Sequence, residues 1–181
     1  EVRFIEEETF RKIIAVVIRP DHKLLCFLAF DIGENVNTLL RLKKSDFFRQ
    51  INPNTKEPEY MVNLPKEKLK RTRLTRSEIT NFKETVELLD LILKDLNEDE
   101  QVFKFEYAQA KKFLNRAVDI ISARCIPKGQ NVTWKDLRSS MACHLLRNHW
   151  TTDEVNARLG HKPSSKEIDK YCNFLAIGRH E

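Results

Sequence analysis

Four side chains in the last third of the sequence are of the types that act on phosphate esters. Lys135 and Arg138 lie near one predicted helix start, His161 lies just after the end of the next predicted helix, and Tyr171 lies on a third. Two cations can bind the non-bridging oxygens of a phosphodiester, an imidazole can hold or move a proton, and a phenol can act as a nucleophile. If the fold brings the four together, the sequence predicts a site for phosphodiester chemistry.

Three helix starts must position these side chains. The pairs Thr133–Asp136, Thr151–Glu154 and Ser164–Glu167 each have the residue types and spacing of a capping box. Gly160 is predicted to close the second helix just before His161. The sequence therefore predicts three short helical segments whose ends present the candidate residues.

Each candidate also has an ordinary structural role open to it. Lys135 can be a surface lysine, and Arg138 can pair with Asp136 in the same helix turn. A histidine at a helix end is more often a cap or a surface residue than a catalyst, which applies to His161. Tyr171 shares a helical face with apolar residues, as a core aromatic does. No single residue decides the function.

A basic segment lies between two predicted strands, residues 59–64 and 76–82. Six of the eleven residues 66–76 are cations, namely Lys66, Lys68, Lys70, Arg71, Arg73 and Arg76. We expect an exposed, flexible hairpin tip that can lie along phosphate groups, with an affinity that falls steeply as salt rises. The alternative is a solvated charged loop without a ligand.

Length and composition bound the class of protein. The 181 residues fit one domain, and 41% apolar content with four glycines favours a compact, helix-rich chain. A net charge of +5 permits a polyanionic partner without requiring one. We expect no membrane span and no secretory signal. The four cysteines are widely spaced, so zinc and disulfides are poorly supported, and reduced thiols in a cytoplasmic protein are expected.

The remaining pattern predicts a mainly α chain with one small antiparallel sheet. Amphipathic helices are predicted at residues 5–18 and 108–121, and a capping box at Asn81–Glu84 predicts another. Residues 24–30 are apolar throughout and fit either a buried helix or a buried strand. Residues 47–58 contain turn signals around Pro53.

Taken in order, the motifs resemble the catalytic domain of tyrosine recombinases, the phage-integrase family. Residues 133–146, TWKDLRSSMACHLL, are similar to the family pattern H-D-L-R-H-x-x-A-x-x-L-L, and LGH at 159–161 and Tyr171 follow as in the family. Residues 31–46 resemble the pattern T-G-L-R-x-S-E-L-L-x-L-x-x-x-D. Residues 60–89 are similar to the family's hairpin and the P-E-T-V-E-L-L helix after it. The resemblance covers nearly the whole chain.

The resemblance implies a fold and an activity. It implies that residues 1–181 are a single catalytic domain, without the family's N-terminal core-binding domain, from an integrase of archaeal or other mobile-element type. Such domains cut DNA without metal or nucleotide cofactor. The tyrosine forms a 3′-phosphotyrosine, and the 5′-hydroxyl that leaves can be replaced by one on a partner strand. The implied function is site-specific recombination or integration.

The resemblance also implies roles for individual residues. Tyr171 matches the nucleophile, Arg138 the arginine that holds the non-bridging oxygens, and His161 the third-box histidine. Lys135 stands where the second-box histidine is expected. The lysine that protonates the leaving oxygen is either Lys70 or Lys68. The remaining cations of the hairpin are expected to contact double-stranded DNA, namely Lys66, Arg71, Arg73 and Arg76.

One departure from the family pattern concerns the first box, where Asn35 stands in place of an arginine. Losing one preorganised group that stabilises transition-state charge typically costs on the order of 3 kcal/mol. The sequence leaves four explanations open: another cation takes the place of the arginine, the domain cuts DNA slowly, the domain binds DNA without cutting it, or the position was engineered. After the recombinase, the second hypothesis for the function is therefore a degenerate DNA-binding module. The third is an RNA-binding domain, which is supported by charge alone.

Partners follow from the same resemblance. Double-stranded DNA is the expected ligand, and the protein is expected to be DNA-associated in the cytoplasm. Residues 172–181 follow the tyrosine, and tails of this kind dock on a neighbouring protomer in the family. Self-association on DNA through this C-terminal segment is therefore expected.

Overall fold

The computed structural model describes residues 2–178. The residues at the starts of its first two helices explain why those helices begin where they do. Helix α1 spans Glu7–Val16, has acidic residues in its first turn, where the helix dipole favours them, and buries Phe10 and Ile13. Helix α2 spans Pro20–Asp31 and begins at a proline, whose fixed φ suits a first turn. Residues 24–30, which fit helix or strand, are helical and completely covered.

The predicted sheet is present, with one strand more than expected. Strands β1 (Phe47–Ile51), β2 (Pro58–Leu64) and β3 (Arg76–Ile79) are antiparallel in that order. Strand β1 was not predicted, because the turn signals in residues 47–58 outweigh it and only its first residue is buried. A strand exposed along its length lacks the apolar alternation by which strands are recognised.

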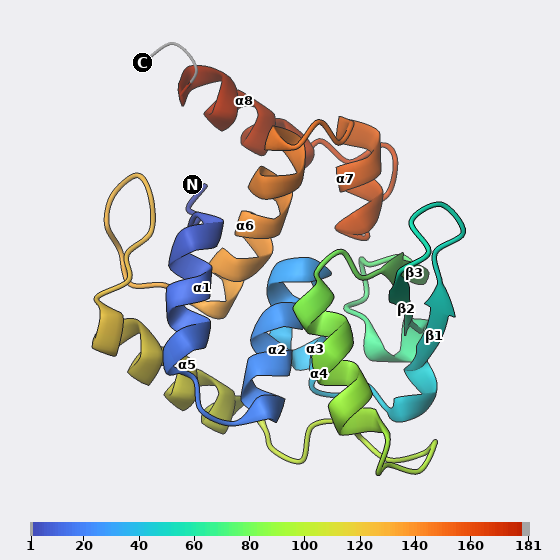
Figure 1. The fold of residues 1–181 in the computed structure, drawn as a ribbon. Helices are drawn as coiled ribbons and strands as arrows, with labels where there is room; N and C mark the ends of the chain where they lie inside the picture. The colour runs from blue at the N-terminus through green and yellow to red at the C-terminus, as the bar shows by residue number, and fades with distance from the viewer. Residues whose placement is uncertain (1, 179–181) are drawn as a thin grey trace.

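The other helices surround α2, which lies in the centre of the molecule (Figure 1). A single turn, α3 (Val36–Leu39), follows α2, and short 3₁₀ turns precede β1 and follow β2. Helix α2 packs against α4 and α6, α1 packs against α5, and α6, α7 and α8 contact one another. The five later helices are α4 (Lys83–Leu93), α5 (Tyr107–Ile121), α6 (Trp134–Arg147), α7 (Thr152–Arg158) and α8 (Ile168–Gly178). The fold class predicted from the sequence is confirmed.

Two of the predicted capping boxes form, and they fix the starts of α6 and α7. Thr133 caps α6 with Asp136, and Thr151 caps α7 with Glu154. The box predicted at Ser164–Glu167 is wrong. Helix α8 begins one residue after Glu167, whose backbone N–H donates to Ser165 Oγ at 3.3 Å, so the preceding segment is a turn.

The box predicted at Asn81–Glu84 is also wrong, because a distant carboxylate caps α4. Asp31, at the end of α2, accepts from the backbone N–H groups of Asn81 and Phe82 at 2.9 and 3.0 Å. It also accepts from Thr85 Oγ1 at 2.9 Å. A tertiary contact therefore replaces the local cap, and it joins α2 firmly to α4.

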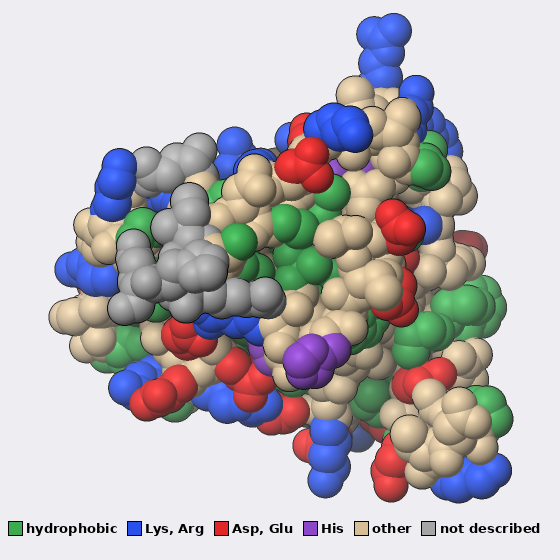
Figure 2. Space-filling view, turned by 90° about the horizontal axis from the view of Figure 1, so that it is seen from above, with side chains coloured by type: hydrophobic (Ala, Val, Ile, Leu, Met, Phe, Trp, Pro, Cys, Tyr) green, Lys and Arg blue, Asp and Glu red, His purple; other side chains and the backbone are tan. Residues whose placement is uncertain are grey.

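A second, smaller hydrophobic cluster lies apart from the main core and holds α6, α7 and α8 together. Its buried members include Met141, Val155, Ile168 and Tyr171. Hydrophobic side chains are visible in patches among backbone and polar atoms in the middle of the face seen from above, with lysine and arginine mainly toward its edge (Figure 2). No helix among residues 2–178 is long and apolar enough to cross a membrane.

Candidate active site

Arg138 is the side chain around which the other candidates are arranged. It is buried on α6, where its Nη2 donates to the Leu159 carbonyl oxygen at 2.6 Å and its Nη1 donates to that of Gly33. It does not pair with Asp136, which binds Arg3 instead, at 2.6 and 2.8 Å. Burial lowers the pKa of Arg138 to about 10, so the guanidinium stays charged at pH 7.

Glu34 places a buried carboxylate beside Arg138. Its Oε1 lies 3.8 Å from Arg138 Nη1, and its Oε2 lies 2.9 Å from Arg76 Nη2. Burial alone would raise the pKa of Glu34, but Arg138 and Arg76 hold it below its usual value. Glu34 was not singled out from the sequence, although it stands next to Asn35 where the family pattern has an apolar residue.

Asn35 faces the same cavity as Arg138. It precedes α3, and its side-chain Nδ2 is buried without a hydrogen-bond partner among residues 2–178. The cavity has a volume of about 310 Å³ and is also lined by Lys70 and Lys135, which are exposed. The structure thus brings the first-box position, a hairpin lysine and the two cations of α6 to one place.

His161 lies just after α7, near enough to Arg138 for the guanidinium charge to affect its pKa. Gly160 ends the helix with a φ of +76°, which favours glycine, and the N–H of His161 donates to the Asn156 carbonyl oxygen at 3.3 Å. The side chain is buried, with Nε2 3.1 Å from Glu167 Oε2. Burial and then the charge of Arg73 lower the pKa of His161 to about 4, against the opposing effect of Glu167. The imidazole is neutral at pH 7.

Tyr171 reaches the same region from α8. Its side chain is 6% exposed and belongs to the smaller hydrophobic cluster, as a core aromatic would. Its hydroxyl lies 3.5 Å from Ser139 Oγ, on the residue after Arg138, and its charge when ionised would raise the pKa of Arg138. Ser139 was not singled out from the sequence. Tyr171 therefore lies close to the guanidinium while its phenol is covered.

The basic segment between β2 and β3 is docked on the end of α7. The N–H of Leu74 donates to the Gly160 carbonyl oxygen at 3.1 Å. Lys66, Lys70 and Arg71 are exposed as predicted. The prediction of an exposed, flexible tip is wrong for the segment as a whole, because part of it packs against the site.

Two of its cations are drawn inward by carboxylates. The side chain of Arg76 is 8% exposed and pairs with Glu34. Lys68 Nζ lies 3.1 Å from Asp46 Oδ2, and both side chains are largely covered. Neither is available to DNA in this arrangement, since ion pairs formed with other parts of the chain hold them.

Arg158 fixes the segment that carries Gly160 and His161. It is buried, and its guanidinium donates to the carbonyl oxygens of Asp31 and Ile79 at 2.9 and 2.8 Å and pairs with Asp31 Oδ1 at 3.2 Å. The end of α7 is therefore bound to both α2 and β3. The position of His161 depends on these contacts.

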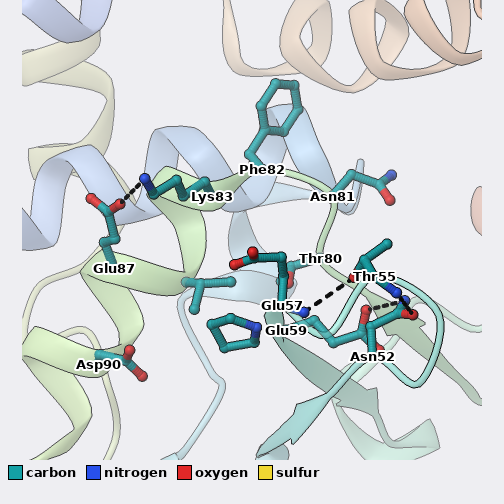
Figure 3. A pocket seen from close by; sticks show the side chains of 12 residues that line it. Asn52, Thr55, Glu57, Glu59, Thr80, Asn81, Phe82, Lys83, Glu87 and Asp90 are labelled. Atoms are coloured by element: carbon teal, nitrogen blue, oxygen red, sulfur yellow. Dashed lines mark hydrogen bonds and ion pairs between the residues drawn. The ribbon is translucent and has the colours of Figure 1, made fainter.

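A larger cavity, of about 540 Å³, lies elsewhere and contains none of the candidates. It is formed by the β1–β2 turn and the start of α4 (Figure 3). Four carboxylates, those of Glu57, Glu59, Glu87 and Asp90, line it with a single lysine. This charge is unfavourable for a phosphate ligand.

Known proteins resemble this chain in structure. No protein-family model matches the sequence, and no curated protein matches it. The crystal structure of XerA recombinase gives a TM-score of 0.66 at 18% identity and covers 98% of this chain and 65% of XerA. XerH recombinase bound to its difH substrate gives a TM-score of 0.66 at 18% identity and covers 93% of this chain and 49% of XerH. The catalytic domain of bacteriophage HP1 integrase gives a TM-score of 0.59 at 17% identity and covers 97% of this chain and 88% of the HP1 domain.

The chain therefore has the fold of tyrosine-recombinase catalytic domains, and the resemblance inferred from its motifs is confirmed at that level. It spans about two thirds of the XerA chain and half of the XerH chain.

Proposed function

We propose that this chain is the catalytic domain of a site-specific tyrosine recombinase or integrase, which cuts and rejoins DNA through a 3′-phosphotyrosine. One observation carries the proposal: Arg138, His161 and Tyr171 meet beside a cavity lined by Lys70 and Lys135. The fold supports it, since similar structures include XerH and lambda integrase, each bound to DNA.

In the proposed cleavage step, Tyr171 Oη attacks the scissile phosphorus. A new P–Oη bond forms as the P–O5′ bond breaks. The phenol proton passes to His161, which is neutral at pH 7, and Lys70 protonates the leaving 5′-oxygen. Arg138 and Lys135 stabilise charge on the non-bridging oxygens. Attack by a 5′-hydroxyl of a partner strand reverses the step, so rejoining needs no ATP or metal ion.

Lys70 is preferred over Lys68 as the general acid. Lys70 is exposed and lines the cavity with Arg138, whereas Lys68 is held by Asp46. The ammonium group of Lys68 would have to break this ion pair to reach a bound phosphate. The positions of the two side chains therefore favour Lys70 as the general acid, a choice that the sequence left open.

The buried phenol of Tyr171 requires α8 to move before attack. Helix α8 is held by the smaller hydrophobic cluster rather than the main core, so its displacement disturbs few elements. We propose that DNA binding shifts α8 and exposes Tyr171. Self-association through residues 172–181 would use the same helix, and residues 179–181 lie outside the part that the structure describes.

The proposed DNA contacts are phosphate contacts, which give affinity and register but carry no base sequence. Exposed Lys66 and Arg71 are suited to them, and Arg73 is half-buried beside the site. Arg76 is withdrawn from this group because Glu34 holds it inside. The proposed location is DNA-associated, in the cytoplasm.

A second function, a DNA-binding module that does not cut, is favoured by Asn35 and Glu34. A neutral amide and a carboxylate lie beside Arg138, the guanidinium expected to hold the phosphate, and they weaken the positive field there. The two functions differ in one product, a covalent protein–DNA adduct.

A pool of nicked duplexes with a randomised centre tests the choice. The nick releases a short product and traps the adduct, which is detected on a denaturing gel. An adduct that disappears in Tyr171→Phe supports the recombinase. If neither the unsubstituted chain nor Asn35→Arg forms an adduct while both bind DNA, the non-cutting module is correct.

A further inference from the structure

Arg73 is a cation without a compensating partner at the site. It lies between β2 and β3, is half-buried, and its Nε has no hydrogen-bond partner among residues 2–178. No carboxylate in that part of the chain lies within ion-pair distance of it, whereas Arg76 and Arg138 share Glu34. A partly buried charge without a partner is costly, which indicates an anionic ligand.

The backbone holds Arg73 in place on both sides. Its N–H donates to the Lys70 carbonyl oxygen at 2.9 Å, and its own carbonyl oxygen accepts from Lys66 Nζ at 2.6 Å. The next residue, Leu74, donates to Gly160, the neighbour of His161. A turn that carries both Lys70 and Arg73 is thus fastened to the end of α7.

Two observations place the Arg73 side chain over the site. A Cβ added to Gly160 would lie 3.3 Å from Arg73 Cδ, so the side chain runs directly past this glycine. The charge of Arg73 also lowers the pKa of both His161 and Arg138, and at His161 it acts more strongly than the carboxylate of Glu167 at 3.1 Å. Arg73 is therefore close to both groups.

We propose that Arg73 binds the scissile phosphate beside Arg138 and supplies the guanidinium charge that Asn35 lacks. The inference rests on the proposed strand cleavage and names a phosphate ligand for it. An arginine presents a planar fork that matches two phosphate oxygens. With Arg138 it would place two such forks on one phosphate, as the missing first-box arginine would have done.

Arg76 is a weaker candidate for this role. Its Nη2 is paired with Glu34 at 2.9 Å, and its Nε donates to the Arg158 carbonyl oxygen at 3.1 Å. Its side chain is also almost completely covered. Arg76 therefore serves to balance Glu34 and fix β3, while Arg73 remains free to bind a ligand.

Inorganic phosphate, titrated while the His161 ring resonances are followed by NMR, tests the inference without requiring cleavage. The spectrum of His161→Gln assigns the resonances. We expect phosphate to shift them in the unsubstituted chain, with about 10- to 100-fold weaker binding in Arg73→Gln and partial retention in Arg73→Lys. Arg116→Gln, an exposed cation on α5, is the control for net charge and should bind as the unsubstituted chain does.

Arg71→Gln separates the site from a simple loop contact. Arg71 is an exposed cation in the same segment, so its loss should weaken duplex binding and leave the phosphate titration unchanged. If the chain forms the covalent adduct, Arg73→Gln should slow its formation about 100-fold or more, with Arg116→Gln unaffected.

The outcomes distinguish the two proposals. Absence of an adduct in the unsubstituted chain counts against strand cleavage, and the phosphate titration still decides the role of Arg73. The inference is overturned if phosphate leaves the His161 resonances of the unsubstituted chain in place, or if Arg73→Gln and Arg116→Gln bind phosphate equally.

Discussion

Glu34 balances two guanidinium groups that the fold brings into a covered site. Its carboxylate lies within 4 Å of Arg76 and Arg138, and its side chain is completely buried. Burial raises the pKa of Glu34, but Arg138, Arg76 and the backbone N–H of Asn35 together hold it below its usual value. In the proposed function, the same carboxylate would reduce the positive charge available to a bound phosphate.

Glu34→Gln is expected to destabilise the fold strongly. It leaves buried Arg138 without its counter-ion and leaves Arg76 with only the more distant carboxylate of Glu78, at 3.8 Å. Breaking a buried pair in this way typically costs about 3–5 kcal/mol. Urea denaturation measures the free energy of unfolding. Glu8→Gln is the control, because Glu8 is exposed on α1 and should change it by no more than about 0.5 kcal/mol. Equal effects would show that the Glu34 pairs contribute little.

His161 should make the fold sensitive to acid over a defined range. Its pKa is about 4 in the folded chain and about 6.5 when unfolded. Between these values the unfolded chain binds more protons, so stability falls as the pH is lowered from 6.5 to 4 and is unaffected by this group above 6.5. We expect the free energy of unfolding, measured in urea at several pH values, to fall less in His161→Gln. Parallel curves for the two proteins would contradict the assigned pKa.

The end of α7 is the element on which the site depends. Arg158 binds it to α2 and β3, Leu74 binds it to the β2–β3 segment, and Gly160 turns the chain just before His161. A local signal, the Leu-Gly-His sequence, marks this position. Contacts from three distant segments make it rigid.

Gly160→Ala tests this element against a matched control. Gly160 and Gly129 have similar left-handed backbones, with φ of +76° and +73°. An added Cβ would lie 2.5 Å from Arg76 Nη1 at Gly160 but would meet open space at Gly129. Both variants should lose about 1–2 kcal/mol from backbone strain. Gly160→Ala should lose more and should also weaken phosphate binding; equal losses would show that the contact with Arg76 is unimportant.

In the molecule as a whole, patterns among neighbouring residues predicted most helices and strands, whereas contacts between residues far apart in the sequence determine the arrangement of the site. Thr133 and Thr151 cap their helices as expected, because a capping box uses residues three apart. The cap by Asp31 and the pairing of Arg76 with Glu34 join residues about 40 to 50 positions apart, so no local pattern reveals them. The exposed strand β1 was missed because it lacks apolar alternation.

The proposed phosphate contacts predict a salt-dependent affinity for DNA. Removing one cation that touches a phosphate should reduce the slope of log K against log salt concentration by roughly 0.9. Arg71→Gln should therefore lower the magnitude of the slope by about this amount, measured by fluorescence anisotropy with a labelled duplex. Arg116→Gln should leave it unchanged. A slope that is the same in all three proteins would remove Arg71 from the DNA interface.

The identity of the residue that becomes linked to DNA decides whether Tyr171 is the nucleophile. The chain is incubated with the nicked duplex pool, digested with nuclease and protease, and analysed by mass spectrometry. We expect a nucleotide joined through its 3′-phosphate to the peptide that contains Tyr171, and to no other peptide. A nucleotide on a different residue, or none on the unsubstituted chain and on Asn35→Arg, would contradict it.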